Sequence, residues 1–165
     1  MGDSRSIGDH SGGSQFCASA VDLRSACSDA ADVRGLDRLC SRSVLVVASE
    51  ARVRRLLAST LAPRFALVES AENTLKAEAL LARCRFDLLI SAFRLPETSV
   101  PDWAQRLRRR GDTTDVLFVA NARDREQAVR AANDARYCLI FEPFAPEQLI
   151  VAARRCTTRR HARPD

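Results

Sequence analysis

The chain has 165 residues, of which 46% are hydrophobic and 28% are charged, values close to those of soluble globular domains. This length suits one ordinary domain with residues to spare, and the composition excludes a fully disordered chain and a small disulfide-bonded scaffold. No run approaches the roughly 18 apolar residues of a membrane-spanning helix, so we expect no membrane insertion.

The charge is basic, with 26 Lys+Arg against 21 Asp+Glu and a net charge of +5. Lys76 is the only lysine, so almost all of the positive charge is guanidinium. The first twenty residues lack the apolar block of a secretory signal, which predicts a cytoplasmic protein with reduced cysteines. The six cysteines show no Cys-x2-Cys spacing, and we expect no zinc site and no cofactor.

The first part of the chain differs from the rest. Residues 1–41 are rich in Gly, Ser and Asp and show little apolar periodicity, so we expect a disordered or weakly structured N-terminal extension. Residues 42–156 are expected to form one domain, and residues 157–165 a basic C-terminal tail.

Strand and helix patterns alternate from Ser43 onward. Val44 to Val47 is a β-branched run typical of a strand buried on both faces, and Glu50 to Leu61 has the apolar spacing of a helix, with Ser49 as its expected N-cap. The expected strands are 44–47, 65–68, 86–91, 116–119 and 138–141. The expected helices are 50–61, 73–84, 101–110, 123–133 and 146–156. Short connections between them predict right-handed βαβ units, hence a three-layer α/β (βα)5 sandwich with a five-stranded parallel sheet.

Four stretches of the sequence resemble the motifs of a known family. They are Val46–Glu50 with Val53–Leu57, Asp87–Pro96, Val116–Ala122, and Ile140–Phe144 with Pro146–Leu149. In this order and spacing, which covers about 43–156, they resemble the bacterial response-regulator receiver domain, also called CheY-like. The resemblance implies a doubly wound, flavodoxin-like sheet of order 2-1-3-4-5.

The family's chemistry implies an acid pair that holds Mg²⁺, an Asp that accepts a phosphoryl group, and a Thr or Ser and a Lys that bind the phosphoryl oxygens. This sequence departs at each position. Ala48 and Ser49 replace the acid pair and Ala92 the phosphoacceptor, while the degenerate switch positions, including the aromatic one, are Ala120, Leu139 and Glu142. A methyl group neither binds a metal nor accepts a phosphoryl group, so the sequence resembles a degenerate or pseudo-receiver.

The resemblance thus implies a stand-alone signalling protein of the two-component or phosphorelay type that is not an enzyme. It would act by phosphorylation-independent protein–protein interaction, with a homodimer through the fourth helix, fifth strand and fifth helix as one arrangement. The candidate interface residues are Arg123, Glu126, Gln127, Arg130, Glu147, Arg154 and Arg155. Trp103 is either a packing residue or an interface anchor.

Some acids and cysteines allow other uses. Glu50, Glu97 and Glu142 map to one edge of the sheet. They are either the ligands of a cation site or acids exposed to solvent. Glu142 could instead pair with Arg94. We expect Cys138 to be a core thiol, and Cys84 and Cys156 to be partly exposed.

Arginine clusters at 106–110 and 154–163 offer an alternative function, a nucleic-acid-associated regulator. Aromatic residues are only 5%, with no stacking platform or recognition helix, which argues against nucleic acid as the partner. An enzyme or small-ligand sensor is disfavoured because the chain has neither a Gly-rich phosphate loop nor a nucleophile–base pair.

Overall fold

The computed structural model describes residues 39–133 and 137–158. Its centre is a parallel sheet of five strands in the order β2-β1-β3-β6-β7. In chain order the strands are β1 (Ser43–Val47), β2 (Leu67–Ala71), β3 (Leu88–Ala92), β6 (Asp115–Ala120) and β7 (Tyr137–Phe141). The predicted α/β class, parallel sheet and strand order are confirmed.

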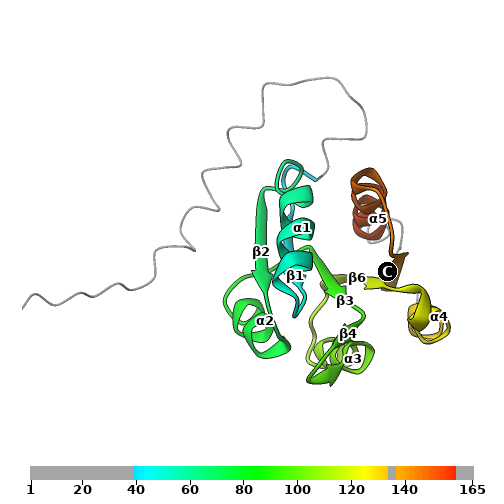
Figure 1. Cartoon of the computed structure of the whole chain (residues 1–165). Helices are drawn as coiled ribbons and strands as arrows, with labels where there is room; N and C mark the ends of the chain where they lie inside the picture. Colours follow the sequence, from blue (N-terminus) through cyan, green and yellow to red (C-terminus); the bar gives the residue numbers. More distant parts are fainter. Residues whose placement is uncertain (1–38, 134–136, 159–165) are drawn as a thin grey trace, which may run out of the picture.

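Helices cover both faces of the sheet (Figure 1). One face packs against α1 (Ala51–Leu61) and α5 (Pro146–Thr158), through residues such as Val44, Val46 and Leu57. The other face packs against α2 (Thr74–Leu81), α3 (Val100–Arg109) and α4 (Arg125–Ala132). Alternate residues of β1 therefore enter different halves of the core, as the period of two in a strand requires. In the part of the chain that the structure describes, no helix is both long and apolar enough to cross a membrane.

Several element boundaries differ from the predictions by one to three residues. The N-cap of α1 is Glu50 rather than Ser49, and its side chain makes no capping hydrogen bond. The predicted second strand at 65–68 begins later, at Leu67, because Phe65 belongs to the turn after α1. Its N–H donates to Leu61 O at 3.1 Å, and its ring packs into the core.

Two short elements were not predicted. Arg94–Leu95 (β4) and Thr98–Ser99 (β5) form a two-stranded antiparallel hairpin between β3 and α3. The predicted helix 123–133 is divided into a 3-10 turn, η2 (Ala122–Asp124), and α4. Asn121 Oδ1 accepts hydrogen bonds from the N–H groups of Arg123 and Asp124 at 2.8 and 3.2 Å, which fixes this start.

The packed chain extends beyond the expected domain at both ends. Leu39 is 2% exposed and packs with the core that α1 and α5 share, although it lies within the expected extension. At the other end α5 continues to Thr158, with Cys156 and Thr157 buried. The expectation that Cys156 is partly exposed was therefore wrong, because the helix continues past it and its Sγ lies 3.5 Å from Val116 O. Cys84 and Cys138 are both half-buried. The rest of the expected extension and of the basic tail lies outside the described residues.

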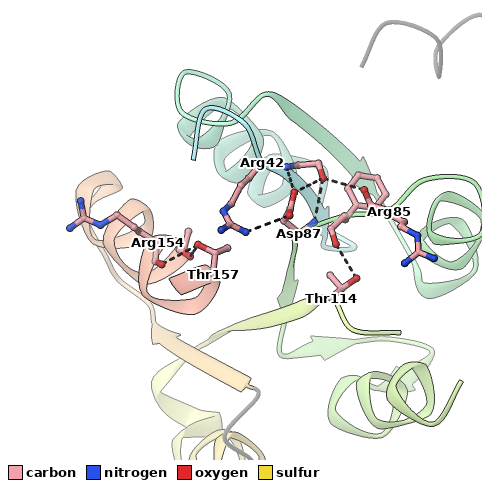
Figure 2. A network of polar contacts seen from close by, with 9 residues as sticks. Arg42, Arg85, Asp87, Thr114, Arg154 and Thr157 are labelled. Atoms are coloured by element: carbon pink, nitrogen blue, oxygen red, sulfur yellow. Dashed lines mark hydrogen bonds and ion pairs between the residues drawn. The ribbon is translucent and has the colours of Figure 1, made fainter. Parts of the chain in front are cut away.

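At the edge where the strands begin, Asp87 joins β1 to the segment before β3. Its Oδ2 accepts hydrogen bonds from Ser43 N at 2.9 Å and Ser43 Oγ at 3.1 Å, and Arg42 Nη1 lies 3.5 Å from Oδ1 (Figure 2). Nearby, Thr114 Oγ1 donates to Phe86 O at 3.1 Å. This network fixes the amino edge of the sheet.

Candidate functional site

A shallow pocket of about 160 Å³ lies at the carboxyl ends of the strands. Ala48 follows β1, Ala92 ends β3, Asn121 follows β6 and Glu142 follows β7, and all four line this pocket together with Ser49. Parallel strands bring their carboxyl ends to one edge, where α/β proteins place their ligands. Most of the candidate site residues that the sequence indicated therefore line one pocket.

The pocket floor carries little chemistry. Ala48 and Ala92 contribute methyl groups, Ser49 a hydroxyl and Asn121 an amide. The carboxylates in the lining come from Glu50, Asp124 and Glu142, and the first and last of these are exposed. Among residues 39–133 and 137–158, no group of three or more His, Cys, Asp or Glu side chains is arranged to hold a metal ion.

The proposed third acid of a cation site, Glu97, is used elsewhere. It lies in the turn between β4 and β5, and its Oε1 accepts a hydrogen bond from Thr74 N at 3.1 Å, at the start of α2. Glu97 is absent from the pocket lining. Its role in the structure is to connect the hairpin to α2.

An arginine–carboxylate pair crosses the pocket instead. Arg94 Nε donates to Asp124 Oδ1 at 2.5 Å, and Arg94 Nη2 donates to Gln127 Oε1 at 3.2 Å. The Asp124 side chain is 4% exposed and that of Arg94 67%. Arg94 therefore pairs with Asp124 rather than with Glu142, and it ties the loop after β3 to the start of α4.

A second arginine holds the loop after β1. Arg54 Nη1 donates to Ala48 O at 2.6 Å and to Ser49 O at 3.1 Å. These contacts satisfy two loop carbonyls and fix the positions that correspond to the acid pair. Sequence reasoning missed both Arg54 and Asp124, because each lies inside a run of charged residues where no spacing marks one as inward-facing.

The remaining switch positions lie behind the pocket. Ala120 is 1% exposed and does not line the pocket, but its carbonyl accepts a hydrogen bond from Glu142 N at 2.8 Å. Leu139 is half-buried against the core that α2, α3 and α4 share, opposite Phe118 in the register of β6 and β7. On the same strand, the Phe141 ring packs against the Arg125 guanidinium. The Cζ atom of Arg125 lies 4.3 Å from the centre of that ring.

The candidate interface residues occupy two helices on opposite faces of the sheet. Arg123, Glu126, Gln127 and Arg130 are exposed on η2 and α4, and Glu126 Oε1 pairs with Arg130 Nη2 at 2.5 Å. On α5, Glu147 and Arg155 are exposed and Arg154 is half-buried. The strand between these helices, β7, is the edge of the sheet, so the two groups flank one edge.

Trp103 does not belong to any accessible surface. It is fully buried in α3, and its Nε1 donates to Glu78 Oε1 on α2 at 2.9 Å. The interpretation of Trp103 as an interface anchor was wrong, since burial among α2, α3 and the sheet leaves no atom for a partner to contact.

A larger groove of about 820 Å³ adjoins the pocket. It runs between the β4–β5 hairpin and α4, and its apolar lining includes Phe93, Leu95 and Pro101. Arg94 and Gln127 line it too, so their hydrogen bond crosses its polar side.

Near the same edge, Lys76 lowers the pKa of the exposed Glu72 carboxyl, first through a hydrogen bond and then through its charge.

Comparisons with known proteins agree with this geometry. The family model described as the response regulator receiver domain matches residues 44–154. The transcriptional regulatory protein ResD of Bacillus subtilis is 26% identical over 121 residues, which are 72% of this chain and 49% of ResD. The chain thus spans about half the length of that relative.

Two solved structures share the fold. The receiver domain of the Francisella response regulator 1452 has a TM-score of 0.63 at 15% identity, covering 72% of this chain and 98% of that one. A structure described as adenylate cyclase from Rhodopirellula baltica has a TM-score of 0.66 at 18% identity, covering 72% of this chain and 88% of that one. At these identities the likeness concerns the fold alone.

Proposed function

This chain belongs to the response regulator receiver domain family, and from that premise we propose that it is a pseudo-receiver. In this proposal it takes up no phosphoryl group and acts in the cytoplasm by protein–protein contact within a two-component type of pathway. It is a signalling module and not an enzyme.

The methyl group of Ala92 is the observation that carries the proposal. It lies at the end of β3, in the strand-end pocket where the family's phosphoacceptor Asp is expected. Acceptance of a phosphoryl group needs a nucleophile, which in this family is a carboxylate oxygen. A methyl group has no lone pair to attack phosphorus, so the central step of the family's chemistry has no acceptor here.

The loss of metal ligands supports the same conclusion. Transfer of a phosphoryl group requires positive charge to offset the negative charge of its oxygens, usually from Mg²⁺. Ala48 and Ser49 stand at the acid-pair positions, and both backbone carbonyls are bonded to Arg54. Magnesium prefers carboxylate ligands in octahedral geometry, and neither of these two side chains supplies a carboxylate. Calorimetric titration with Mg²⁺ should therefore show no binding.

The Arg94–Asp124 pair supports a single position of α4, in place of a switch that depends on phosphorylation. A signalling change that moves α4 would have to break this pair and leave the buried Asp124 carboxylate without its cation, which is costly. We infer that this pair holds α4 in place, so the surface that α4 presents does not depend on phosphorylation.

The surface proposed to meet a partner is formed by α4, β7 and α5. Two of the exposed large apolar residues lie there, Val129 on α4 at 44% exposed and Val151 on α5 at 39%. Exposed charged residues lie beside them in the sequence, Arg130 next to Val129 and Glu147 one turn before Val151. Protein interfaces combine such apolar and polar residues. A second copy of this chain or another signalling protein could bind to it.

Light scattering of the full chain after size-exclusion chromatography tests this surface. If the chain associates with itself there, Val129→Glu and Val151→Glu should each lower the apparent mass toward that of the monomer. Leu75→Glu is the matched control, because Leu75 is 79% exposed on α2, away from β7. Equal effects of all three substitutions would contradict the assignment of this surface.

A further inference from the structure

Arginine side chains gather at the amino edge of the sheet, the edge opposite the strand-end pocket. They come from the segments that precede β2, β3 and β6 and from the end of α5, which parallel strand topology brings to one edge. We call this set the arginine edge: Arg64, Arg83, Arg85, Arg109, Arg110 and Arg155. All six are exposed.

Most of these guanidinium groups are not used to hold the fold together. Within residues 39–133 and 137–158, Arg64, Arg83, Arg85 and Arg155 form no ion pair, whereas Arg110 pairs with Glu78 at 3.1 Å. Figure 2 shows the side chain of Arg85, a member of this set, pointing away from the Asp87 network. The positive charge at this edge is thus directed to solvent.

Two carboxylates at the same edge, those of Asp87 and Asp112, accept hydrogen bonds from within the chain. Asp87 accepts hydrogen bonds from Ser43, and Asp112 Oδ1 accepts one from Thr114 N at 2.8 Å. Other acids, including Glu50, Glu97 and Glu142, lie at the opposite edge, near the pocket. This segregation leaves a positive field at one edge of the molecule, which attracts polyanions.

The helix dipole accounts for only part of this arrangement. Cations in the last turn of a helix interact favourably with its negative end, which applies to Arg109 in α3 and Arg155 in α5. Arg64 lies three residues past the end of α1, and Arg85 four residues past the end of α2. The dipole effect fades beyond the last turn, so helix stability does not explain these loop arginines.

The described loops of the arginine edge expose no large apolar residue. This favours a nucleic acid over an acidic protein as the partner. Protein interfaces have an apolar core, but the large hydrophobic residues exposed in the described part of the chain lie on the helices: Leu56, Leu75, Val129 and Val151. No residue of this kind is exposed in the described loops of the arginine edge. Guanidinium groups bind phosphate oxygens in bidentate fashion, and contacts to the phosphate backbone need no apolar core.

We propose that the arginine edge binds the phosphate backbone of double-stranded nucleic acid without sequence preference. This function goes beyond the proposed signalling role and uses the other edge of the sheet. The scarcity of aromatic residues argues against stacking on single strands, but not against duplex binding through phosphates.

Fluorescence anisotropy with a labelled DNA duplex of mixed sequence and the full chain tests the proposal. The test variant carries Arg64→Gln, Arg83→Gln and Arg85→Gln. The matched control carries Arg52→Gln, Arg55→Gln and Arg123→Gln, which remove the same charge from exposed arginines of α1 and η2, away from this edge. Thermal melts of both variants establish that they fold.

We expect the chain to bind the duplex at low salt and the affinity to fall steeply as salt rises, because binding to phosphates releases counterions. The test variant should bind at least about tenfold more weakly, and its salt slope should be smaller by roughly 0.9 for each phosphate that it no longer neutralises. The control should keep most of the affinity and all of the slope. Equal weakening in both variants, no binding at low salt, or equally tight binding of polyglutamate would overturn the proposal.

Discussion

Ala92 shows how one residue type decides which chemistry a receiver fold can perform. Its backbone position at the end of β3 is the one that a phosphoacceptor would need, and the strand pairs on both sides in normal register. The fold therefore does not depend on the carboxylate. The chemistry does, because the carboxylate oxygen is the nucleophile to which the phosphoryl group is transferred.

We expect Ala92→Asp to destabilise the protein by at most roughly 1–3 kcal/mol, the range for a polar group buried without a partner, because Ala92 is half-buried. Glu50, Asp124 and Glu142 line the same pocket, so their negative charge would raise the pKa of the introduced carboxyl. The deficit should shrink as the pH falls through that raised pKa, because the neutral form carries no penalty from these charges. Urea denaturation at several pH values measures this, with the uncharged Ala92→Asn as the control. A deficit that does not change with pH would show that these charges do not act on residue 92.

A combined variant should regain metal affinity. Ala48→Asp, Ser49→Asp, Ala92→Asp and Glu142→Lys change four residues that line one pocket, whereas Ala120 is left unchanged because it does not line that pocket. The added lysine and Mg²⁺ would offset the three carboxylates, so we expect a smaller loss of stability than with Ala92→Asp alone and a rise in melting temperature on addition of Mg²⁺. If the variant folds but shows no Mg²⁺-dependent shift, these positions do not form one site.

At the scale of the elements, the contact between the β4–β5 hairpin and α4 holds the proposed output surface in place. Arg94 reaches from β4 to Asp124 and Gln127, and Asn121 caps the turn that leads into α4. Few backbone hydrogen bonds hold so short a helix, so its position depends on such side-chain contacts. The pair therefore determines how rigid this surface is.

Removing this pair should loosen α4 selectively. We expect Arg94→Ala to lower the amide hydrogen-exchange protection of residues 122–132 and to cost about 1–3 kcal/mol, since Asp124 stays buried without its cation. Arg106→Ala is the control, because Arg106 is an exposed arginine whose Nη2 is 3.4 Å from Thr98 Oγ1 on β5. Unchanged protection of α4 in Arg94→Ala would show that the pair does not hold the helix.

On the scale of the whole molecule, the alternation of apolar strands and amphipathic helices was enough to predict the fold. The runs 44–47 and 116–119 are buried on both faces, and such runs leave few topologies open when the connections are short. The convergence of Ala48, Ser49, Ala92 and Glu142 on one pocket followed from that topology and the resemblance.

The contacts of individual side chains were not predictable in the same way. Nothing in the sequence distinguishes Asp124 from its charged neighbours as a buried residue, nor Trp103 as wholly enclosed. Both depend on where α2, α3 and α4 settle on the sheet. Leu39 was assigned to the extension because residues 1–41 as a whole show little apolar periodicity, yet it packs into the core.

Leu39 leads to a prediction about the start of the domain. A chain that begins at residue 42 should be less stable than one that begins at residue 39 by roughly 1.5–3 kcal/mol, the value of burying one leucine, because Leu39 is 2% exposed. Denaturant unfolding of the two truncated chains and of Leu39→Ala in the full chain measures this. Equal stabilities of all three and the full chain would mean that the packing of Leu39 contributes nothing.

The central claim is that this receiver cannot be phosphorylated at the end of β3, and intact-mass spectrometry tests it most directly. The full chain is incubated with acetyl phosphate and Mg²⁺ and compared with the four-residue variant that restores the acids and the lysine. We predict that the mass of the unaltered chain does not change, because Ala92 offers no oxygen nucleophile. A stable, acid-labile adduct of one phosphoryl group on the unaltered chain would contradict the account.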